Sequence, residues 1–320
     1  MSLLGAFERA ILARCSPAGS RARLLTLTYH RVPPSTDPVL PDEPDASGFA
    51  TEMDILAYYC QVLPLPEAVR RLRSGTLPAR AACVTFDDGY ENNLSVALPI
   101  LEKRGMTATV FIAADAIDRG IMWNDLLIEA MRRVGSAVGY REFGLAGQPG
   151  PEVPEAERIM RVVRHVRYEP LERRSELALA FYQKVAPGAM PRLMLTQGQV
   201  RQIAARGHDV GAHTIHHPIL KGLESAVARA EIVDSYAWVA DVAGRAPASF
   251  AYPNGFPGRD YDDSHAAMAR DAGFELAVSM RWGCATSRSD PYHLPRCLPW
   301  SVRSSIYPVR LARTYLLEAD

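Results

Sequence analysis

Two adjacent carboxylates, Asp87 and Asp88, follow a short apolar run and precede Gly89. The run Ala81–Phe86 is β-prone and predicts a buried strand, which the glycine would end. The two carboxylates are therefore expected where a strand meets a loop, close to the core. Neighbouring anions are costly in such a place unless a cation or a proton offsets their charge.

A second polar cluster follows much later in the chain, within Gly211–Pro218. It contains His213, His216 and His217. Spacing alone does not choose between the last two as a partner of His213, because positions i+3 and i+4 both share a helix face with position i. One carboxylate and two imidazoles would form a three-ligand set that leaves coordination positions of a metal ion open for water.

Together these segments resemble two motifs of the polysaccharide deacetylases, carbohydrate esterase family four, which carry the chitooligosaccharide deacetylase homology domain. The motif Thr-Phe-Asp-Asp-Gly is complete at residues 85–89, and the motif His-(Ser/Thr)-x-x-His-Pro is complete at residues 213–218. The resemblance implies that Asp87 is the catalytic base. It also implies that Asp88, His213 and His217 bind a divalent metal, with zinc expected first, although such sites accept several metals.

The reaction that this resemblance implies is removal of N-acetyl groups from a glycan or a glycolipid precursor, by a hydrolase of carbon–nitrogen bonds in linear amides. A divalent metal would polarise the amide carbonyl and lower the pKa of a bound water to roughly 7. Asp87, which is not a ligand, would take the proton from that water. The same site could serve a carbohydrate O-acetyl esterase. A catalytically silent, metal-holding glycan-binding protein is a third hypothesis, against which the intact Asp87 argues.

The chain departs from a third family motif, Arg-x-Pro-Tyr. In the corresponding segment, Ala251 stands in place of the arginine and Asn254 in place of the tyrosine. The resemblance implies that the backbone N–H at this tyrosine position stabilises an oxyanion, and Asn254 can still supply it. The resemblance also implies that the arginine of this motif holds the catalytic carboxylate. Arg296 is the candidate that supplies the missing guanidinium. The alternative is that Arg296 forms an ordinary surface ion pair.

The family's last motif, Leu-x-His, supplies a general acid and is absent near the C-terminus. His30, at the end of an expected first strand, is the candidate for this role, because imidazole titrates near neutral pH. His293 is an alternative acid, and a structural, hydrogen-bonded role is the alternative for His30. Trp123 could stack on a sugar ring or anchor a neighbouring segment.

The elements that must position these residues alternate between strands and helices. Strands are expected at residues 24–30, 81–86, 107–112, 208–213, 248–252 and 274–279. Helices are expected at residues 49–73 with a break at 63–66, at 94–104 and at 225–243. This alternation predicts a parallel α/β sheet with its chemistry at the carboxyl ends of the strands. The resemblance implies a distorted, incomplete (β/α) barrel.

The expected organisation has three parts. Residues 1–23 form an N-terminal helix, residues 24–300 form the deacetylase domain, and residues 301–320 form a C-terminal helical tail. A stretch rich in Arg, Glu, Ala and Leu, at about residues 118–197, predicts a helical insertion within the domain. We found no internal repeat and no low-complexity tract.

Composition narrows the partners and the location. The chain has 320 residues, of which 48% are hydrophobic, and its 36 basic and 36 acidic residues give a formal net charge of zero. This balance gives no global attraction to nucleic acid. The expected partner is the N-acetylated carbohydrate that the resemblance implies. An odd number of cysteines, with no Cys-x-x-Cys pair, predicts reduced thiols in a cytoplasmic protein.

The N-terminal segment has no basic region typical of a signal peptide, so no secretion is expected. Its apolar residues follow helical spacing: Leu3, Leu4, Phe7, Ile11 and Leu12. We expect a helix packed on the domain, with a peripheral contact to the inner membrane as the alternative.

Overall fold

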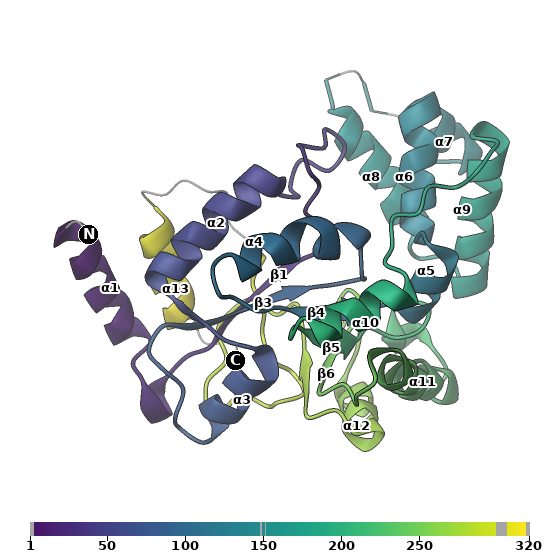
Figure 1. Ribbon diagram of the computed structural model, residues 1–320. Helices are drawn as coiled ribbons and strands as arrows, with labels where there is room; N and C mark the ends of the chain where they lie inside the picture. Colours follow the sequence, from purple (N-terminus) through teal and green to yellow (C-terminus); the bar gives the residue numbers. More distant parts are fainter. Residues whose placement is uncertain (1–2, 148, 151, 299–305, 318–320) are drawn as a thin grey trace.

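A computed structural model describes the chain except for residues 1–2, 148, 151, 299–305 and 318–320 (Figure 1). Its centre is a parallel sheet in the order β1-β3-β4-β5-β6-β7, and β2 also pairs with β3. The strands are β1 Leu25–Tyr29, β2 Gln61–Val62, β3 Ala81–Phe86, β4 Thr109–Ile112, β5 Asp209–Ala212, β6 Ser249–Ala251 and β7 Leu276–Val278. Each strand expected from the sequence is confirmed, whereas β2 was not expected.

The sheet curls, and its two edges are joined by a segment that is not a regular strand. Leu294 forms a parallel bridge with Val278 of β7, and Cys297 forms one with Leu27 of β1. Residues 294–297 therefore span the gap between the first and last strands of the sheet. The result is a half-barrel with surrounding helices, which confirms the expected distorted, incomplete (β/α) barrel.

Helices connect the strands and cover the sheet. They are α1 Leu3–Cys15, α2 Ala46–Tyr59, α3 Leu65–Arg73, α4 Leu98–Glu102, α5 Ala114–Arg119, α10 Gln197–Ala205, α11 Ser225–Ala243, α12 Asp263–Ala272 and α13 Tyr307–Leu316. The expected break between α2 and α3 begins earlier than predicted, because the chain forms β2 there. The expected helix at 94–104 starts with a π-helical turn over residues 93–97.

Three of these helices, α5, α10 and α12, were not expected. For two of them the sequence did contain a signal. A capping box of Thr196 and Gln199 begins α10, and one of Asp262 and His265 begins α12. In each box, the side chain of the residue before the helix accepts a hydrogen bond from the backbone N–H of the third helical residue. The side chain of that third residue accepts one from the backbone N–H of the residue before the helix. These bonds satisfy backbone N–H groups that would otherwise be unpaired.

Four helices gather beside the carboxyl end of β4, at the upper right of Figure 1. They are α6 Trp123–Val134, α7 Ser136–Glu142, α8 Glu155–Val166 and α9 Leu171–Val185. They enclose an apolar core of their own, with Leu127, Ile159, Val163, Phe181 and Tyr182 among its buried side chains. These helices lie within the stretch expected to be a helical insertion, and the division of the chain into domains stays a prediction.

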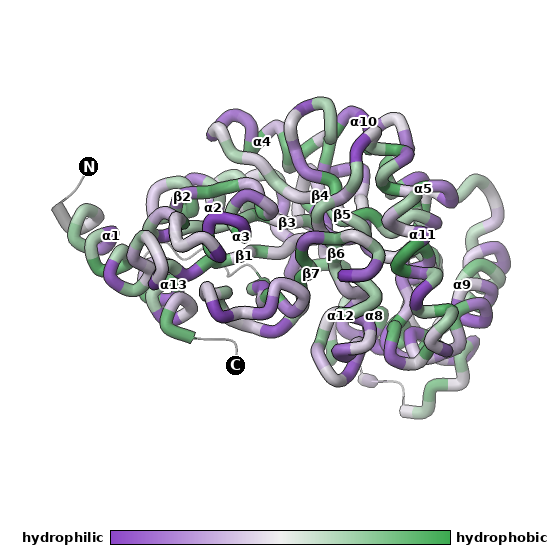
Figure 2. The backbone as a smooth tube through the Cα atoms, turned by 90° about the horizontal axis from the view of Figure 1, so that it is seen from below, coloured by the Kyte–Doolittle hydropathy of each residue, from purple (hydrophilic) through white to green (hydrophobic). Residues whose placement is uncertain are grey.

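The terminal helices α1 and α13 pack against each other at one end of the molecule (Figure 2). Leu12 of α1 is buried in the main core, and Tyr59 of α2 donates a hydrogen bond to Glu8 at 2.6 Å. In the described part of the chain, no helix combines the length and the apolar character that crossing a membrane requires. The five cysteines form no disulfide with one another.

Candidate metal centre and active site

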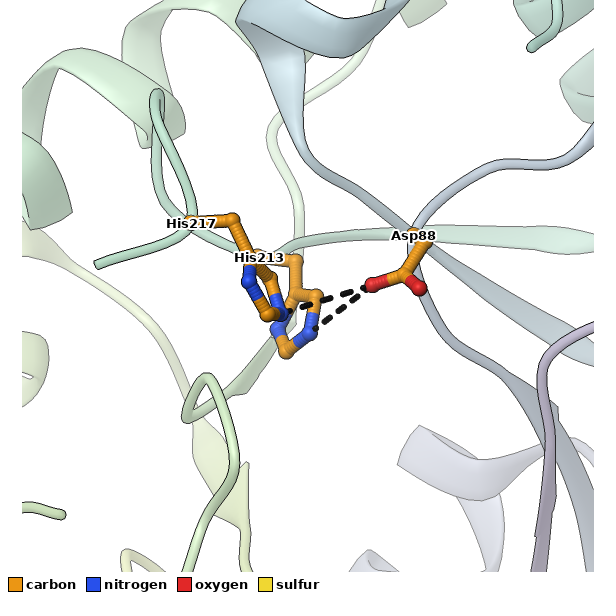
Figure 3. Close-up of side chains that lie close together, drawn as sticks. All are labelled: Asp88, His213 and His217. Carbon is orange, nitrogen blue, oxygen red and sulfur yellow. Dashed lines mark ion pairs between the residues drawn. The ribbon is translucent and has the colours of Figure 1, made fainter. Parts of the chain in front are cut away.

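The two motifs meet at the carboxyl end of the sheet. Asp88 follows β3, and His213 directly follows β5. His217 lies four residues further on, in a loop. The Nε2 atoms of both histidines lie 3.5 Å from Oδ1 of Asp88 (Figure 3). One ligand atom from each residue falls within 4.8 Å of the others, so the three could hold one metal ion.

The chemistry of this donor set fits a divalent metal. Oδ1 of Asp88 is buried and has no hydrogen-bond partner among the described residues. Nδ1 of His213 donates to the carbonyl of Ala251 at 2.7 Å, which leaves Nε2 with its lone pair facing Asp88. Burial lowers the pKa of His217 well below its usual range, so the imidazole is neutral as a ligand must be.

The backbone at the ligands is in an uncommon conformation. Asp88 and His217 have positive φ angles of 75° and 54°, and Thr214 between the two histidines has 63°. Such angles are unfavourable for residues other than glycine and persist only where the surroundings impose them. Thr214 supplies part of this constraint, since its hydroxyl donates to the His213 carbonyl and accepts from the His217 N–H at 3.1 Å.

The structure brings His217, and not His216, beside Asp88. Nδ1 of His216 lies 2.6 Å from Oε1 of Glu231 on α11, and Oε2 of Glu231 accepts from the N–H groups of Ile215 and His216. His216 therefore anchors the loop to α11. The segment is a loop and not a helix, so an argument from helix faces could not have separated the two histidines.

Asp87 is held by Arg296 in a buried, bidentate pair. Nη1 and Nη2 of Arg296 lie 2.7 Å and 2.8 Å from the two carboxylate oxygens. Burial by itself would raise the pKa of Asp87, but the Arg296 guanidinium outweighs it and holds the pKa well below the usual range. Arg296 also donates to the carbonyl of Ser279 and the hydroxyl of Thr28. The alternative of a surface ion pair for Arg296 is therefore wrong.

Asn254 lies in the cavity wall beside the metal ligands. Its φ angle is 58°, and no hydrogen bond among the described residues uses its backbone N–H. The donor expected at this position is thus present and free.

The two candidate acids occupy different cavities. His30 lies in the wall of the cavity that contains Asp88, with Nδ1 3.9 Å from Glu43. Burial by itself would lower the pKa of His30, but the carboxylates of Asp88, Glu43 and Asp87 raise it above its usual value. His293 lines a separate cavity, where it contacts the hydroxyl of Tyr261 and lies 3.5 Å from Asp263.

Most of the predicted site residues line a single cavity of about 340 Å³. The predicted residues in its wall are His30, Asp87, Asp88, His213, His217 and Asn254. Arg296 lies behind Asp87, outside the wall. This volume is at the lower end of the range for small-molecule sites, roughly 300–1,000 Å³.

Four arginines in the cavity wall were not expected from the sequence: Arg31, Arg167, Arg174 and Arg259. No motif marks them, and two come from the helical insertion. Arg174 also covers one face of Trp123, with its guanidinium carbon 4.5 Å from the ring centroid. Trp123 therefore helps to anchor the insertion, and it lines the cavity as well.

Arg174 carries its charge in an unusual environment. Burial, together with the charge of Arg167, lowers its pKa to about 10. Its Nη2 group donates to the carbonyls of His216 and His217 at 3.4 Å and 3.2 Å. The helical insertion is thereby connected to the loop that carries His217, a candidate metal ligand.

Comparisons with known proteins agree with this geometry. A family model described as polysaccharide deacetylase matches residues 74–144 and 164–277. A Bacillus subtilis protein, YxkH, described as a polysaccharide deacetylase, is 22% identical over 237 residues, which are 74% of this chain. The chain spans 58% of the length of that relative.

Solved structures share the fold. The deacetylase PplD of Streptococcus pyogenes, solved in complex with acetate, gives a TM-score of 0.61 at 18% identity, covering 92% of this chain and 98% of that one. IcaB from Ammonifex degensii gives a TM-score of 0.59 at 19% identity, covering 94% and 99%. At these identities the similarity concerns the fold.

Proposed function

Because the chain belongs to the polysaccharide deacetylase family, we propose that it hydrolyses the N-acetyl groups of a glycan or of a glycolipid precursor. Asp88, His213 and His217 would hold a divalent metal, with zinc expected first. The observation that carries this proposal is the buried Asp87–Arg296 pair, because its Asp87 lies beside those ligands in the wall of the same cavity. A protein that only binds glycans has no use for an oriented, ionised base.

Asp87 is suited to take a proton from the attacking water. Arg296 fixes the carboxylate plane and keeps it ionised. Each carboxylate oxygen has two lone pairs and uses one for the guanidinium, so a second remains available to accept the proton. When bound, a divalent metal supplies Lewis acidity that polarises a carbonyl and makes water a better nucleophile at neutral pH.

The remaining groups serve the other charges that develop. The free N–H of Asn254 can donate to the oxygen that becomes negative as the carbonyl is attacked. His30 can donate a proton to the leaving nitrogen, and the neighbouring carboxylates favour its protonated form. Amine expulsion needs this proton, because an unprotonated amide nitrogen is a poor leaving group.

The test is acetate release from a panel of N-acetylated and O-acetylated glycans, with chelator and after addition of metal. We expect release from N-acetylated glycans that stops with chelator and returns with metal. Asp87→Asn should lose turnover and keep the metal, because an amide oxygen can still accept from Arg296 but cannot take the proton. Release from O-acetylated glycans alone would replace the proposal by an esterase, and no release from any glycan would favour a binding protein.

We also propose a cytoplasmic location with peripheral contact to the inner membrane. Support comes from exposed apolar side chains on the paired terminal helices, Phe7 and Ile11 on α1 and Val309 and Leu316 on α13. The unpaired cysteines fit a reducing compartment. Leu12 must be removed from the expected contact, because it is buried in the core. The side chains of Leu3 and Leu4 lie outside the described residues.

A further inference from the structure

Two arginines of the helical insertion reach the active-site cavity without an anionic partner. They are Arg167, which ends α8, and Arg174 in α9. In the described part of the chain, no carboxylate lies within ion-pair distance of either. The other two arginines of this wall are neutralised, since Arg31 pairs with buried Asp125 and Arg259 lies 3.0 Å from Asp260.

The carboxylates of the cavity wall are all engaged with other groups. Asp87 pairs with Arg296, and Asp88 faces the two histidines. Glu43 accepts from the backbone N–H of Arg31 and lies near His30. The two insertion arginines therefore add positive charge to this wall, and no ion pair among the described residues offsets it.

Arg174 is buried, which makes this imbalance costly. Its Nη2 group donates to two backbone carbonyls and its plane covers Trp123. Its Nε–H, however, is buried and finds no partner in the part of the chain that the structure describes. A buried cation is normally paired with an anion, and a buried donor is normally hydrogen-bonded. Arg167 beside it is half-exposed and has no side-chain partner among the described residues.

The same two arginines also line a second cavity of about 440 Å³. Most of its other wall residues are apolar or aromatic: Tyr168, Pro170, Leu171, Pro218, Ile219, Leu223 and Val227. Glu169 and Glu172 also lie in this wall, but in the described part of the chain neither forms an ion pair with the two arginines. Arg167 and Arg174 thus stand at the boundary between the metal-site cavity and a more apolar one. A group held between them would lie beside a sugar bound in the first cavity.

We propose that Arg167 and Arg174 form a phosphate subsite, so that the substrate is a phosphate ester of an N-acetylated sugar and not a neutral glycan. The substrate assignment rests on the proposed deacetylase function. Two guanidinium groups match a phosphate monoester, which carries about −1.5 to −2 charges at pH 7, better than a single carboxylate. The planar forks of arginine also suit phosphate oxygens geometrically.

The direct test is a calorimetric titration of the metal-loaded protein with inorganic phosphate, which contains neither a sugar nor an acetamide. We expect binding to the wild type and a loss of affinity of about tenfold or more in Arg167→Gln, because a charge-assisted pair is removed. Arg164→Gln is the matched control, since Arg164 is an exposed arginine of the same helix outside the cavity wall, and it should bind as the wild type does.

Arg174→Gln should weaken binding similarly, with exposed Arg173→Gln as its neighbour control. Because Arg174 also holds the loop that contains His217, the thermal unfolding and the metal content of the Arg174→Gln variant must be measured together with its phosphate affinity. Arg167 makes no such contact, so its variant keeps the test meaningful if the Arg174 variant misfolds.

Phosphate affinity that is unchanged in Arg167→Gln would overturn the subsite, and it would mean that phosphate binds elsewhere, for example at the metal. Equally tight binding of methyl glucuronide would overturn the choice of phosphate over carboxylate. Acetate release from neutral chitooligosaccharides is measured separately. If the protein binds phosphate through these arginines but releases acetate from no substrate, the proposed deacetylase function is refuted and the subsite is not. If it releases acetate but does not bind phosphate there, the subsite alone is refuted.

Discussion

Arg296 replaces, from a different part of the chain, a guanidinium that the third motif lacks. Its contacts with Asp87, Thr28 and Ser279 leave none of its nitrogens directed to solvent. Arg296 and Asp87 depend on each other, because either charge alone would be buried without compensation.

Removing Arg296 should therefore damage both stability and activity. Arg296→Gln is expected to lower the free energy of unfolding by about 3–5 kcal/mol, the usual cost of leaving one member of a buried pair, and to reduce kcat strongly. Urea unfolding and acetate release measure the two effects. Exposed Arg201→Gln on α10 is the control. The double variant with Asp87→Asn should recover stability and not activity, and additive losses in it would contradict the pairing.

Mutation should distinguish the roles of His213 and His216. His213→Ala should lose the bound metal, because one of three protein ligands is removed. His216→Ala should keep a full equivalent, because His216 is tied to Glu231 and not to the metal site. Metal analysis of the purified variants decides this, and loss of metal from the His216 variant with retention in the His213 variant would show that the ligand set is wrong.

His30 and His293 form a second matched pair. His30→Ala should lower kcat by about 10²–10⁴-fold, the usual contribution of general acid catalysis, while metal content stays intact. His293→Ala should have little effect on kcat, because His293 lines another cavity. If His293→Ala caused the larger loss, the assignment of the acid to His30 would have to be reversed.

At the level of elements, the sequence predicted those parts of the site that follow regular strands. Asp87 and Asp88 come directly after the apolar run 81–86, and His213 stands at the end of the expected strand 208–213, so their position at one sheet edge follows from parallel pairing. The contact between Asp87 and Arg296 could not be predicted in this way, because it depends on how residues 294–297 cross the gap in the barrel.

The arginines of the insertion were beyond sequence reasoning for a related reason. Arg167 and Arg174 look like ordinary members of an Arg- and Glu-rich helical stretch. Their place in the cavity wall follows from the way α8 and α9 dock against the loop after β5, which periodicity does not report. Even the choice of His217 over His216 required a resemblance, because the loop is not helical.

The loop from His213 to His217 is held in its strained conformation partly by Thr214. Thr214→Val keeps the shape but removes the hydroxyl that bridges the two ligands. We expect metal affinity to fall by about 10–100-fold, as is usual for groups that orient metal ligands. Competition with a chelator measures this affinity. Thr51→Val, which removes an exposed hydroxyl on α2, should leave it unchanged.

At the scale of the whole molecule, the terminal helices lie at one end of the fold, whereas the helical insertion lies beside the other end of the sheet (Figure 1). Contact of α1 and α13 with a membrane would thus leave the insertion's side of the cavity uncovered. Overall neutrality gives no attraction to an anionic surface, so any contact must come from local features. The described part of α13 has Arg310 and Arg313 and no acidic residue.

The membrane proposal predicts that the protein floats with anionic lipid vesicles. Replacing Phe7, Ile11, Val309 and Leu316 with serine should abolish flotation, because these exposed side chains would provide the apolar contact. Val227→Ser and Val233→Ser, at exposed positions on α11, form the control. Point variants are preferable to deletion of α1, since losing buried Leu12 would disturb the core. Flotation by the control variant alone supports the proposal, whereas equal recovery of both variants in the soluble or the vesicle fraction would remove α1 and α13 as the contact.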